Sequence, residues 1–574
     1  MPSSPLRAFP VGSTTPSLSH GLVHPAAATS MAWHWQVVLL CAWLTTIGNV
    51  ALWQQLWALP EVGGWQGVRF MLGMGGLVFG VLVALMALFA WPRVFKPAAT
   101  LLLLAAAAAT HFMLVYSALI DSTMLVNVLH TDAREAGDLM SMRFALTMLG
   151  LGVLPSLWLW RQPTPTARWY RRALANVGMA TVGLLVAGLA LFVVFQDFAS
   201  VMRNHKQVRY LINPLNSVYA VGKVVADQAP RTQQPLQAVA VDAQLGPSYA
   251  GQTAPPLLVI VVGETARATN FGLGGYGRDT TPQLRELANQ GQLTYFNNAW
   301  SCGTNTQASV PCMFSHLGKA GFEGNPERFD NLLDVLQRAG LAVVWIDNQS
   351  GCKGLCERVP NVNTRESPDP RLCPQGECDD TIMIPTMERA LQALPPERTT
   401  KGTVVVLHQM GSHGPAYFKR APERLKAYMP ECASTALQDC SRDEVVNAYD
   451  NSIRATDDFL AQTIGWLQRQ PGSTGLLYIS DHGESLGENN LYLHGLPYAM
   501  APDDQKHVPM LTWLSTGLQQ RLALPMDCLG HKASDRLTHD HLFHSVLGLL
   551  DVHTAVHQPK LDVFASCKAT GAAS

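Results

Sequence analysis

The stretch "PLLVIVVGETAR" (Pro256–Arg267) is a run of large apolar residues that ends in a glycine and is followed by a glutamate. Polar residues do not alternate with apolar ones along the run, which is typical of a strand buried on both faces of a sheet. The turn after such a strand can present a polar side chain at the edge of the sheet. The stretch therefore predicts a central strand of an α/β domain, with Glu264 at its carboxyl end.

Four further apolar runs repeat this pattern along the chain. They are "LAVVWI", "GTVVVLH", "TGLLYIS" and "VPMLTWLS", which begin at Leu341, Gly402, Thr474 and Val508. Amphipathic stretches such as "FDNLLDVLQRAG" and "NAYDNSIRATDDFLAQTIGWLQ" lie between them. Buried strands separated by helices indicate a mostly parallel sheet covered on both faces. We expect this α/β domain to occupy residues 257–574.

Polar residues cluster directly after the expected strands. Glu264 follows the first strand, "DNQSGCKG" (Asp347–Gly354) the second, His413 the third, and the pair Asp481 and His482 the fourth. Ligand sites in open α/β sheets lie along the carboxyl ends of the strands, so these segments should converge. Two carboxylates and an imidazole suit zinc or another divalent transition ion. The pattern predicts a metal-dependent site.

The loop "SCGTNTQASVPCMFS" (Ser301–Ser315) places two threonines between two cysteines. Threonine is a weak nucleophile at its free pKa, but coordination to a divalent cation favours the alkoxide. Thr304 precedes an expected helix turn, whose unpaired backbone N–H groups would favour a phosphate. Thr306 is the competing hydroxyl, and spacing alone does not choose between the two.

The first 200 residues contain five apolar runs without a single charged residue. Most of them reach the roughly 20 residues that a helix needs to cross a bilayer. We therefore expect a five-helix transmembrane domain at 31–197, preceded by a disordered segment at 1–30 and followed by an interfacial linker at 198–256. The five runs are Val37–Trp57, Met71–Trp91, Ala98–Ile120, Phe144–Trp160 and Ala173–Phe195.

The charges of the short loops predict the orientation of these spans. Arg93 and Lys96 follow the second span, and four arginines between Arg161 and Arg172 separate the fourth from the fifth. Positively charged loops stay in the cytoplasm, so the chain after the fifth span should lie outside it. The net charge of −1 and the absence of a basic tract give no case for nucleic-acid binding.

The cysteines agree with an oxidising compartment. Of eleven cysteines, all but Cys41 follow residue 300, and closely spaced even numbers favour disulfides. The paired Cys-x2-Cys knuckles of a zinc ribbon do not occur. The expected pairs are Cys302 with Cys312, Cys352 with Cys356, Cys373 with Cys378, Cys432 with Cys440 and, by elimination, Cys528 with Cys567.

Five long motifs carry a resemblance to a known family. They are "VVGETARATNFGLGGYGRDTTP", "SCGTNTQASVPCMFS", "LHQMGSHGPAYFKR", "NAYDNSIRATDDF" and "SDHGESLGENNLYLHGLPYAMAP". The chain resembles the lipid A phosphoethanolamine transferases, including the mobile colistin-resistance enzymes, of the alkaline phosphatase and sulfatase superfamily. The resemblance extends over nearly the whole chain after residue 31, spans included.

The resemblance implies a zinc-dependent, multi-pass enzyme of the bacterial inner membrane with its catalytic domain in the periplasm. It implies that a threonine takes phosphoethanolamine from phosphatidylethanolamine and passes it to a phosphate of lipid A. It also implies a threonine nucleophile, Thr304, and histidines, His413 and His494, that bind a second zinc or the substrate phosphate or move protons. We expect a monomer. The implied zinc ligands are Glu264, Thr304, Asp481 and His482.

Two further groups of residues match substrate-contacting segments of that family. In the loop after the second strand, the candidates for contact with the lipid headgroup are Asn348, Gln349, Ser350 and Lys353. In the outward loop after the third span, Asn127, Thr131 and Glu135 recur every four residues, which places them on one face of a helix. The alternative for this trio is a solvated face of an interfacial helix.

An added ammonium group offsets phosphate charge on lipid A, so such an enzyme should lower polymyxin and colistin binding. One rival function is a hydrolase that releases phosphoethanolamine to water, and another is a glycerophosphate transferase, which the "SCGT…PC" loop disfavours. A non-catalytic membrane sensor is a third. It is disfavoured because degenerate enzymes usually lose a metal ligand, and here none is missing.

Overall fold

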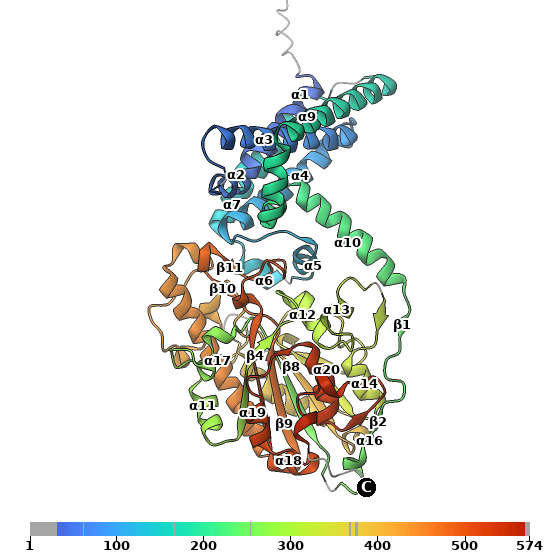
Figure 1. Ribbon diagram of the computed structural model, residues 1–574, viewed down its shortest axis with the longest axis vertical. Coiled ribbons are helices and arrows are strands. Elements are labelled where there is room, and N and C mark those ends of the chain that lie inside the picture. Colours follow the sequence, from blue (N-terminus) through green and yellow to red (C-terminus); the bar gives the residue numbers. More distant parts are fainter. Residues whose placement is uncertain are drawn as a thin grey trace, which may run out of the picture.

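The computed structural model describes residues 31–568, apart from 61, 132, 165–166, 253, 326, 367–368 and 374–376. The predicted disordered segment 1–30 lies outside the described residues. A helical bundle and an α/β domain are stacked end to end (Figure 1).

The bundle contains the five predicted spans. Each is long and apolar enough to cross a membrane, and the bounds are Trp33–Trp57, Gly64–Phe89, Phe95–Val115, Met142–Arg161 and Trp169–Asn204. The first is built from α1 (Trp33–Thr46) and α2 (Val50–Trp57), and the fourth from α7 (Met142–Thr147) and α8 (Leu154–Arg161). The second, third and fifth are α3 (Gly64–Phe89), α4 (Phe95–Val115) and α9 (Trp169–Asn204).

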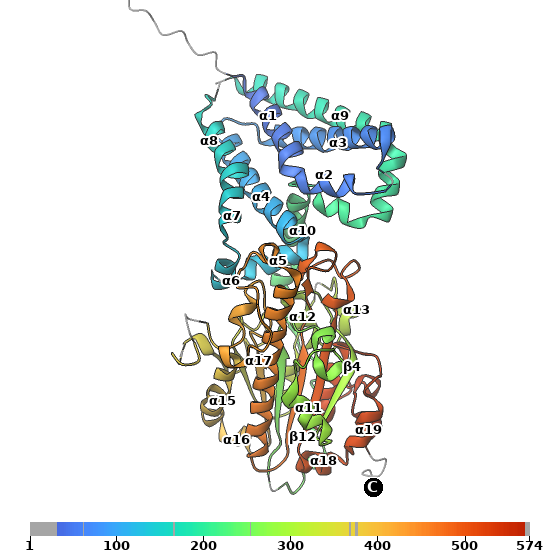
Figure 2. The same ribbon diagram turned by 90° about the vertical axis from the view of Figure 1, so that its left-hand side faces the viewer.

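Small residues let α3 and α9 pack closely (Figure 2). A Cβ atom on Gly80 of α3 would lie 2.4 Å from the carbonyl oxygen of Gly183 in α9, so only glycine fits there. Close backbone approach at small residues is a main source of helix association in lipid, where apolar burial gives little driving force.

The predicted linker is largely helical. It contains the end of α9 and the whole of α10 (Leu215–Gln233), which runs diagonally from the bundle toward the α/β domain in Figure 1. Between these helices Asn213 is buried in the bundle, and its Nδ2 donates to the carbonyl oxygens of Gly48 (3.0 Å) and Ala106 (2.8 Å). These bonds tie the start of the linker to the first and third spans.

The α/β domain is built on one eight-stranded sheet of order β13-β4-β12-β9-β3-β8-β6-β7. Strand β12 is antiparallel to both neighbours, and every other pair in the sheet is parallel. The mostly parallel sheet predicted from the sequence is therefore present. The strands are β13 (Leu537–Thr538), β4 (Leu293–Trp300), β12 (His507–Leu514), β9 (Thr474–Ser480), β3 (Leu257–Gly263), β8 (Thr403–His408), β6 (Ala342–Asp347) and β7 (Asn361–Asn363).

Helices cover both faces of this sheet. One face packs against α11 (Pro282–Asn289), α15 (Met383–Gln392) and α17 (Arg442–Gln468). The helices on the other face are α12 (Thr306–Met313), α14 (Leu332–Arg338), α18 (Thr516–Leu522), α19 (Met526–His531) and α20 (Asp540–Leu549). The strands between these layers are almost wholly apolar, because neither face of the sheet meets water.

The carboxyl ends of the parallel strands point toward the membrane bundle. The loop after β8 carries Lys419, whose Nζ lies 2.6 Å from Asp138 of α6 (Ala133–Asp138), a helix between the third and fourth spans. The neighbouring α5 (Ser122–His130) packs against α12. The edge of the sheet that usually binds ligands is thus covered by the membrane domain.

Disulfides occur only in the α/β domain among the described residues. Cys41, inside the bundle, is buried and unpaired. The bonded pairs are Cys302–Cys312, Cys352–Cys356, Cys373–Cys378, Cys432–Cys440 and Cys528–Cys567.

Candidate active site

Glu264, Asp481 and His482 meet at the carboxyl ends of β3 and β9. These strands are parallel neighbours, and Gly263 is in register with Ser480, so the residues that follow lie side by side. The three possible ligand atoms lie within 4.8 Å of one another, and all three side chains are fully buried. Register alone thus brings together residues more than 200 positions apart in the sequence.

The donor set of this cluster fits a divalent metal ion. His482 Nδ1 lies 2.9 Å from the carbonyl oxygen of Gly483, which can only accept, so Nδ1 donates there and Nε2 is the ring nitrogen that faces the carboxylates. That Nε2 lies 3.4 Å from Glu264 Oε1 and 3.3 Å from Asp481 Oδ2. Within the described part of the chain Asp481 Oδ2 makes no hydrogen bond. Two carboxylate oxygens and an imidazole nitrogen that converge in a buried site are a ligand set that suits zinc.

The titration of the cluster reflects the same crowding of charge. Burial and the charge of Glu264 raise the pKa of Asp481 to about 6. Burial alone would lower the pKa of His482, but the Asp481 and Glu264 carboxylates raise it to about 10. Burial alone would raise the pKa of Glu264, but the hydrogen bond and charge of His482 lower it. Without a metal the cluster therefore keeps a proton, which a bound cation would displace.

The structure places Thr306, not the predicted Thr304, beside this cluster. Thr306 Oγ1 lies 3.3 and 3.2 Å from the two carboxylate oxygens of Glu264 and 3.5 Å from His482 Nε2. Thr304 Oγ1 instead donates to the carbonyl oxygen of Leu496 at 2.6 Å.

The start of α12 explains this difference. Asn305 is the N-cap, and its side chain accepts from the backbone N–H of Ala308 at 2.9 Å, so Thr306 is the first helical residue. The first turn of α12 therefore presents the Thr306 hydroxyl and the positive end of the helix dipole to the cluster.

A second group of histidines adjoins the cluster. The ring of His494 lies 4.2 Å from that of His482 and 5.7 Å from that of His413, between centroids. His494 Nδ1 is 3.2 Å from Oε1 of Glu484, a fully buried carboxylate that also accepts from the Tyr417 hydroxyl at 2.9 Å. Glu484 therefore orients His494. Glu484 was not predicted as a site residue, although it stands two residues after His482 in "SDHGES".

The loop after β6 forms one wall of a hollow next to His413. We call this the headgroup hollow, and its lining includes Asp138, Asn348, Gln349, Ser350, His413 and Arg420. Three of the four residues predicted to contact a lipid headgroup are thus together. Lys353 is not in this lining; its Nζ donates to Ser350 Oγ at 2.8 Å, and its side chain borders a separate surface depression.

A half-buried carboxylate that the sequence did not reveal, Asp380, holds this wall in place. Asp380 accepts from Asn348 Nδ2 at 2.8 Å and from the backbone N–H groups of Met410 (2.8 Å) and Gly411 (3.0 Å). Gly411 has φ +51°, and a Cβ atom there would lie 2.5 Å from the carbonyl oxygen of Glu264. Asp380 therefore fixes the loops after β6 and β8 to each other and against the metal cluster.

The prediction that Asn127, Thr131 and Glu135 share one helical face is wrong. Helix α5 ends at His130, and Thr131 is extended, with ψ 130°. The Thr131 hydroxyl donates to the carbonyl oxygen of Asn127 at 2.9 Å, which satisfies a group left free by the end of the helix. Glu135 belongs to the next helix, α6, and its side chain lies outside the described structure.

The membrane domain still contributes to the site. A Cβ atom on Gly495, next to His494, would meet the sulfur of Met124 in α5 at 3.0 Å. Gly495 N also donates to the carbonyl oxygen of Thr304 at 2.8 Å. Helix α5 therefore contacts the segment that follows His494, and that segment is bonded to the threonine loop.

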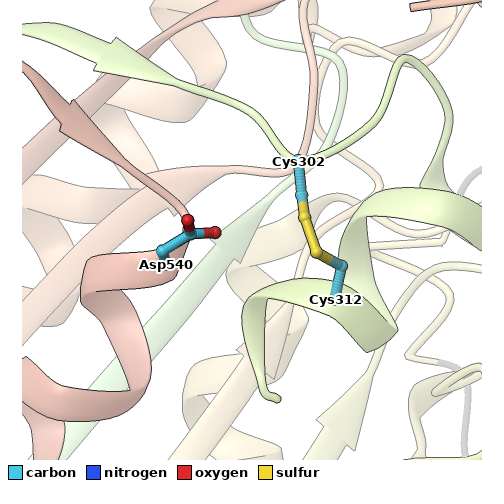
Figure 3. Close-up of side chains that lie close together, drawn as sticks. All are labelled: Cys302, Cys312 and Asp540. Carbon is cyan, nitrogen blue, oxygen red and sulfur yellow. A yellow bond between two sulfur atoms is a disulfide. The ribbon is translucent and has the colours of Figure 1, made fainter. Parts of the chain in front are cut away.

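Cys302, Cys312 and Asp540 also lie close together (Figure 3). The two sulfur atoms are bonded to each other and so do not bind a metal. Asp540 accepts from the backbone N–H of Lys319 at 2.8 Å. This group fastens the threonine loop to its surroundings.

Comparison with known proteins matches both parts of the chain. Residues 256–552 match a family model described as Sulfatase, and residues 78–229 match one described as Phosphoethanolamine transferase EptA/EptB. Phosphoethanolamine transferase EptA of Escherichia coli (strain K12) is 36% identical over 543 residues, which cover 94% of this chain and 97% of the relative. Phosphatidylethanolamine transferase Mcr-1 of Escherichia coli is 36% identical, with 90% and 94% covered.

Solved structures agree with these matches. Integral membrane protein lipooligosaccharide phosphoethanolamine transferase A (EptA) from Neisseria meningitidis superposes with a TM-score of 0.88 at 34% identity. That superposition covers 93% of this chain and 98% of the other. The two molecules therefore share both the bundle and the α/β domain.

Proposed function

The chain belongs to the EptA and MCR family of phosphoethanolamine transferases, within the sulfatase superfamily, and on that premise we propose that Thr306 is its nucleophile. The protein is an integral membrane enzyme with five spans and a periplasmic catalytic domain. The observation that supports Thr306 is its hydroxyl within 3.5 Å of both Glu264 and His482.

Glu264, Asp481 and His482, with Thr306 as the fourth ligand, would hold zinc. A zinc ion bound there supplies positive charge that favours the alkoxide of Thr306 and stabilises negative charge on the phosphoryl group. The first turn of α12 presents its unpaired backbone N–H groups to the same phosphoryl group.

The donor is phosphatidylethanolamine and the acceptor is a phosphate of lipid A. Thr306 Oγ attacks the phosphorus of the donor, the bond to the glycerol oxygen breaks, and diacylglycerol leaves with a proton from His413 or His494. An oxygen of the lipid A phosphate then attacks the same phosphorus, and the bond to Thr306 breaks. Glu484 orients His494 for the proton transfer.

Transfer is favoured over hydrolysis because the membrane domain covers the site. Leu496 and Ala501, in the segment after His494, are buried in the same apolar cluster as the membrane helices. A water-excluded site protects a phosphorylated threonine from hydrolysis. Addition of an ammonium group to lipid A then lowers the binding of polymyxin and colistin to the outer surface.

Mass spectrometry of lipid A from a polymyxin-sensitive Gram-negative host tests this proposal. The host would express the intact chain, Thr306→Ala or Thr304→Ala. We expect phosphoethanolamine on lipid A with the intact chain, and still with Thr304→Ala in reduced amount, but none with Thr306→Ala. Modification by Thr306→Ala, with loss in Thr304→Ala, would reverse the assignment of the nucleophile.

A further inference from the structure

Two lysines lie against the ring of Tyr498, and an arginine lies nearby, on the β4 side of the metal centre. Lys319 Nζ lies 3.2 Å and Lys506 Nζ 5.5 Å from the centroid of the Tyr498 ring. Burial raises the pKa of Tyr498, while the nearby Arg536 guanidinium acts against that rise. The guanidinium carbon of Arg536 is also 4.7 Å from the centroid of the Trp300 ring. We call Lys319, Lys506 and Arg536 the cation cluster.

Short contacts attach the cation cluster to the threonine loop. Lys319 Nζ donates to the carbonyl oxygen of Cys302, and the Tyr498 hydroxyl donates to that of Ser301 at 3.0 Å. Ser301 N in turn donates to the carbonyl oxygen of Lys506 at 2.8 Å. The cation cluster therefore touches the two residues at the start of the loop that carries the nucleophile.

The position of the cation cluster suits a membrane-bound substrate. Strand β4 is parallel to the strands that carry the metal ligands and ends at Trp300, so the cation cluster lies at the same edge of the sheet as the metal centre. Lys319 belongs to α13 (Gly318–Phe322), which lies at the end of the α/β domain nearest the membrane bundle (Figures 1 and 2).

The carboxylates that pair with the two lysines of the cation cluster are mostly exposed. Burial lowers the pKa of Lys319, the carboxylates of Glu323 and Asp540 oppose that change, and the ammonium of Lys506 adds to it. The carboxylates that pair with the two lysines are Glu323 (2.9 Å) and Asp503 (3.2 Å), and their side chains are 61% and 74% exposed. Exposed pairs of this kind contribute about 0–1 kcal/mol and exchange easily. A phosphate can replace them and relieve the repulsion between Lys319 and Lys506.

We propose that the cation cluster binds a second phosphate of the acceptor while the phosphate that receives the transferred group lies at the metal centre. The inference rests on the proposed function, in which the acceptor is a phosphorylated glycolipid. Lipid A carries a phosphate at each end of its disaccharide, whereas the donor lipid has only one phosphate. The cation cluster thus selects a bis-phosphorylated acceptor and is not needed for attack on the donor.

The test compares two acceptors with the full-length enzyme in phosphatidylethanolamine vesicles. With the intact enzyme we expect the KM for bisphosphoryl lipid A to be about tenfold lower than that for monophosphoryl lipid A. A difference of about tenfold in affinity is what one phosphate–arginine contact typically contributes. In Lys506→Gln/Arg536→Gln this ratio should fall to about one. The matched control is Arg521→Gln. The guanidinium carbon of Arg521 lies 4.3 Å from the centroid of the Tyr249 ring, and Arg521 belongs to α18, which follows the end of β12 that is far from Lys506. The control should keep the tenfold ratio.

Release of diacylglycerol without an acceptor separates this inference from the proposed function. If the intact enzyme releases no diacylglycerol, the proposed function fails. The inference fails if diacylglycerol release is normal but the intact enzyme has the same KM for both acceptors. It also fails if the double variant keeps the tenfold difference between the two acceptors. Slower diacylglycerol release in the folded double variant would assign the donor's phosphate to the cation cluster and would also overturn the inference.

Discussion

The headgroup hollow and the cation cluster lie on opposite sides of the metal centre and differ in charge. In the headgroup hollow opposite charges are paired, since Arg420 lies 2.5 Å from Glu377 and 3.3 Å from Asp138. In the cation cluster two lysines lie against the Tyr498 ring with Arg536 nearby, and the carboxylates that pair with the lysines, Glu323 and Asp503, are mostly exposed. A site whose opposite charges are paired and largely buried suits a zwitterionic headgroup, and a site whose cations have only exposed, exchangeable partners suits a polyanion. The comparison indicates that donor and acceptor approach one nucleophile from different sides.

Metal removal should have the largest effect, because both sides depend on the same centre. Treatment of the enzyme with a chelator should slow diacylglycerol release and transfer to lipid A alike, each by more than about 1,000-fold. Zinc should restore both rates. The measurement is the rate of each half-reaction before and after chelation. If only one half-reaction slowed, the two substrates would not share this centre.

Loss of the Glu484 carboxylate should have the second-largest effect on turnover. Glu484→Gln keeps the shape of the side chain but removes the charge that orients His494, so we expect kcat to fall about 10- to 100-fold for both half-reactions. The control is Glu388→Gln, because Glu388 accepts from Trp466 Nε1 at 2.6 Å in α15, outside the site. Unchanged turnover in Glu484→Gln would show that His494 needs no such partner.

The affinity for zinc should depend on pH. His482 has a pKa raised to about 10 in the metal-free cluster, so zinc must displace one proton at neutral pH. The Kd for zinc should therefore fall about tenfold per pH unit between about pH 6 and about pH 8. Below about pH 6 Asp481 also takes up a proton, and the slope should steepen. Titration with metal buffers measures this slope, and a flat profile would mean that the cluster holds no displaceable proton.

The smallest effect concerns the headgroup hollow alone. Asp138→Asn removes the charge that balances Arg420 and Lys419, and should raise the KM for phosphatidylethanolamine about fivefold, the equivalent of about 1 kcal/mol. The KM for lipid A should not change. Asp439→Asn serves as the control, because it breaks another ion pair between the two domains. In that pair Arg143 lies 2.6 Å from Asp439, and both side chains are half-exposed. An equal rise in both variants would assign the effect to docking of the domains.

Much of the architecture could be predicted because it depends on local patterns. Uninterrupted apolar runs predicted the spans and the strands. The polar residues that follow two of those strands predicted Glu264, Asp481 and His482 as metal-site residues. The family suggested by the five motifs is confirmed by the relatives and by the structural match. Parallel register then brings the three residues together without further information.

What could not be predicted depends on single hydrogen bonds or on long-range packing. The choice between Thr304 and Thr306 is decided by Asn305, whose N-cap bond sets the first residue of α12. The break after α5 depends on the Thr131 hydroxyl bond, which spacing does not reveal. The members of the cation cluster come from three separate segments, so only the folded chain shows them together.

Identification of the modified residue tests the central claim most directly. The full-length enzyme would be incubated with phosphatidylethanolamine in the absence of lipid A, denatured, digested and analysed by tandem mass spectrometry. We predict one phosphoethanolamine group on Thr306, which disappears when lipid A is added before denaturation. The same group on Thr304, or on neither threonine while diacylglycerol is released, would contradict the proposal that Thr306 carries the group from one side of the metal centre to the other.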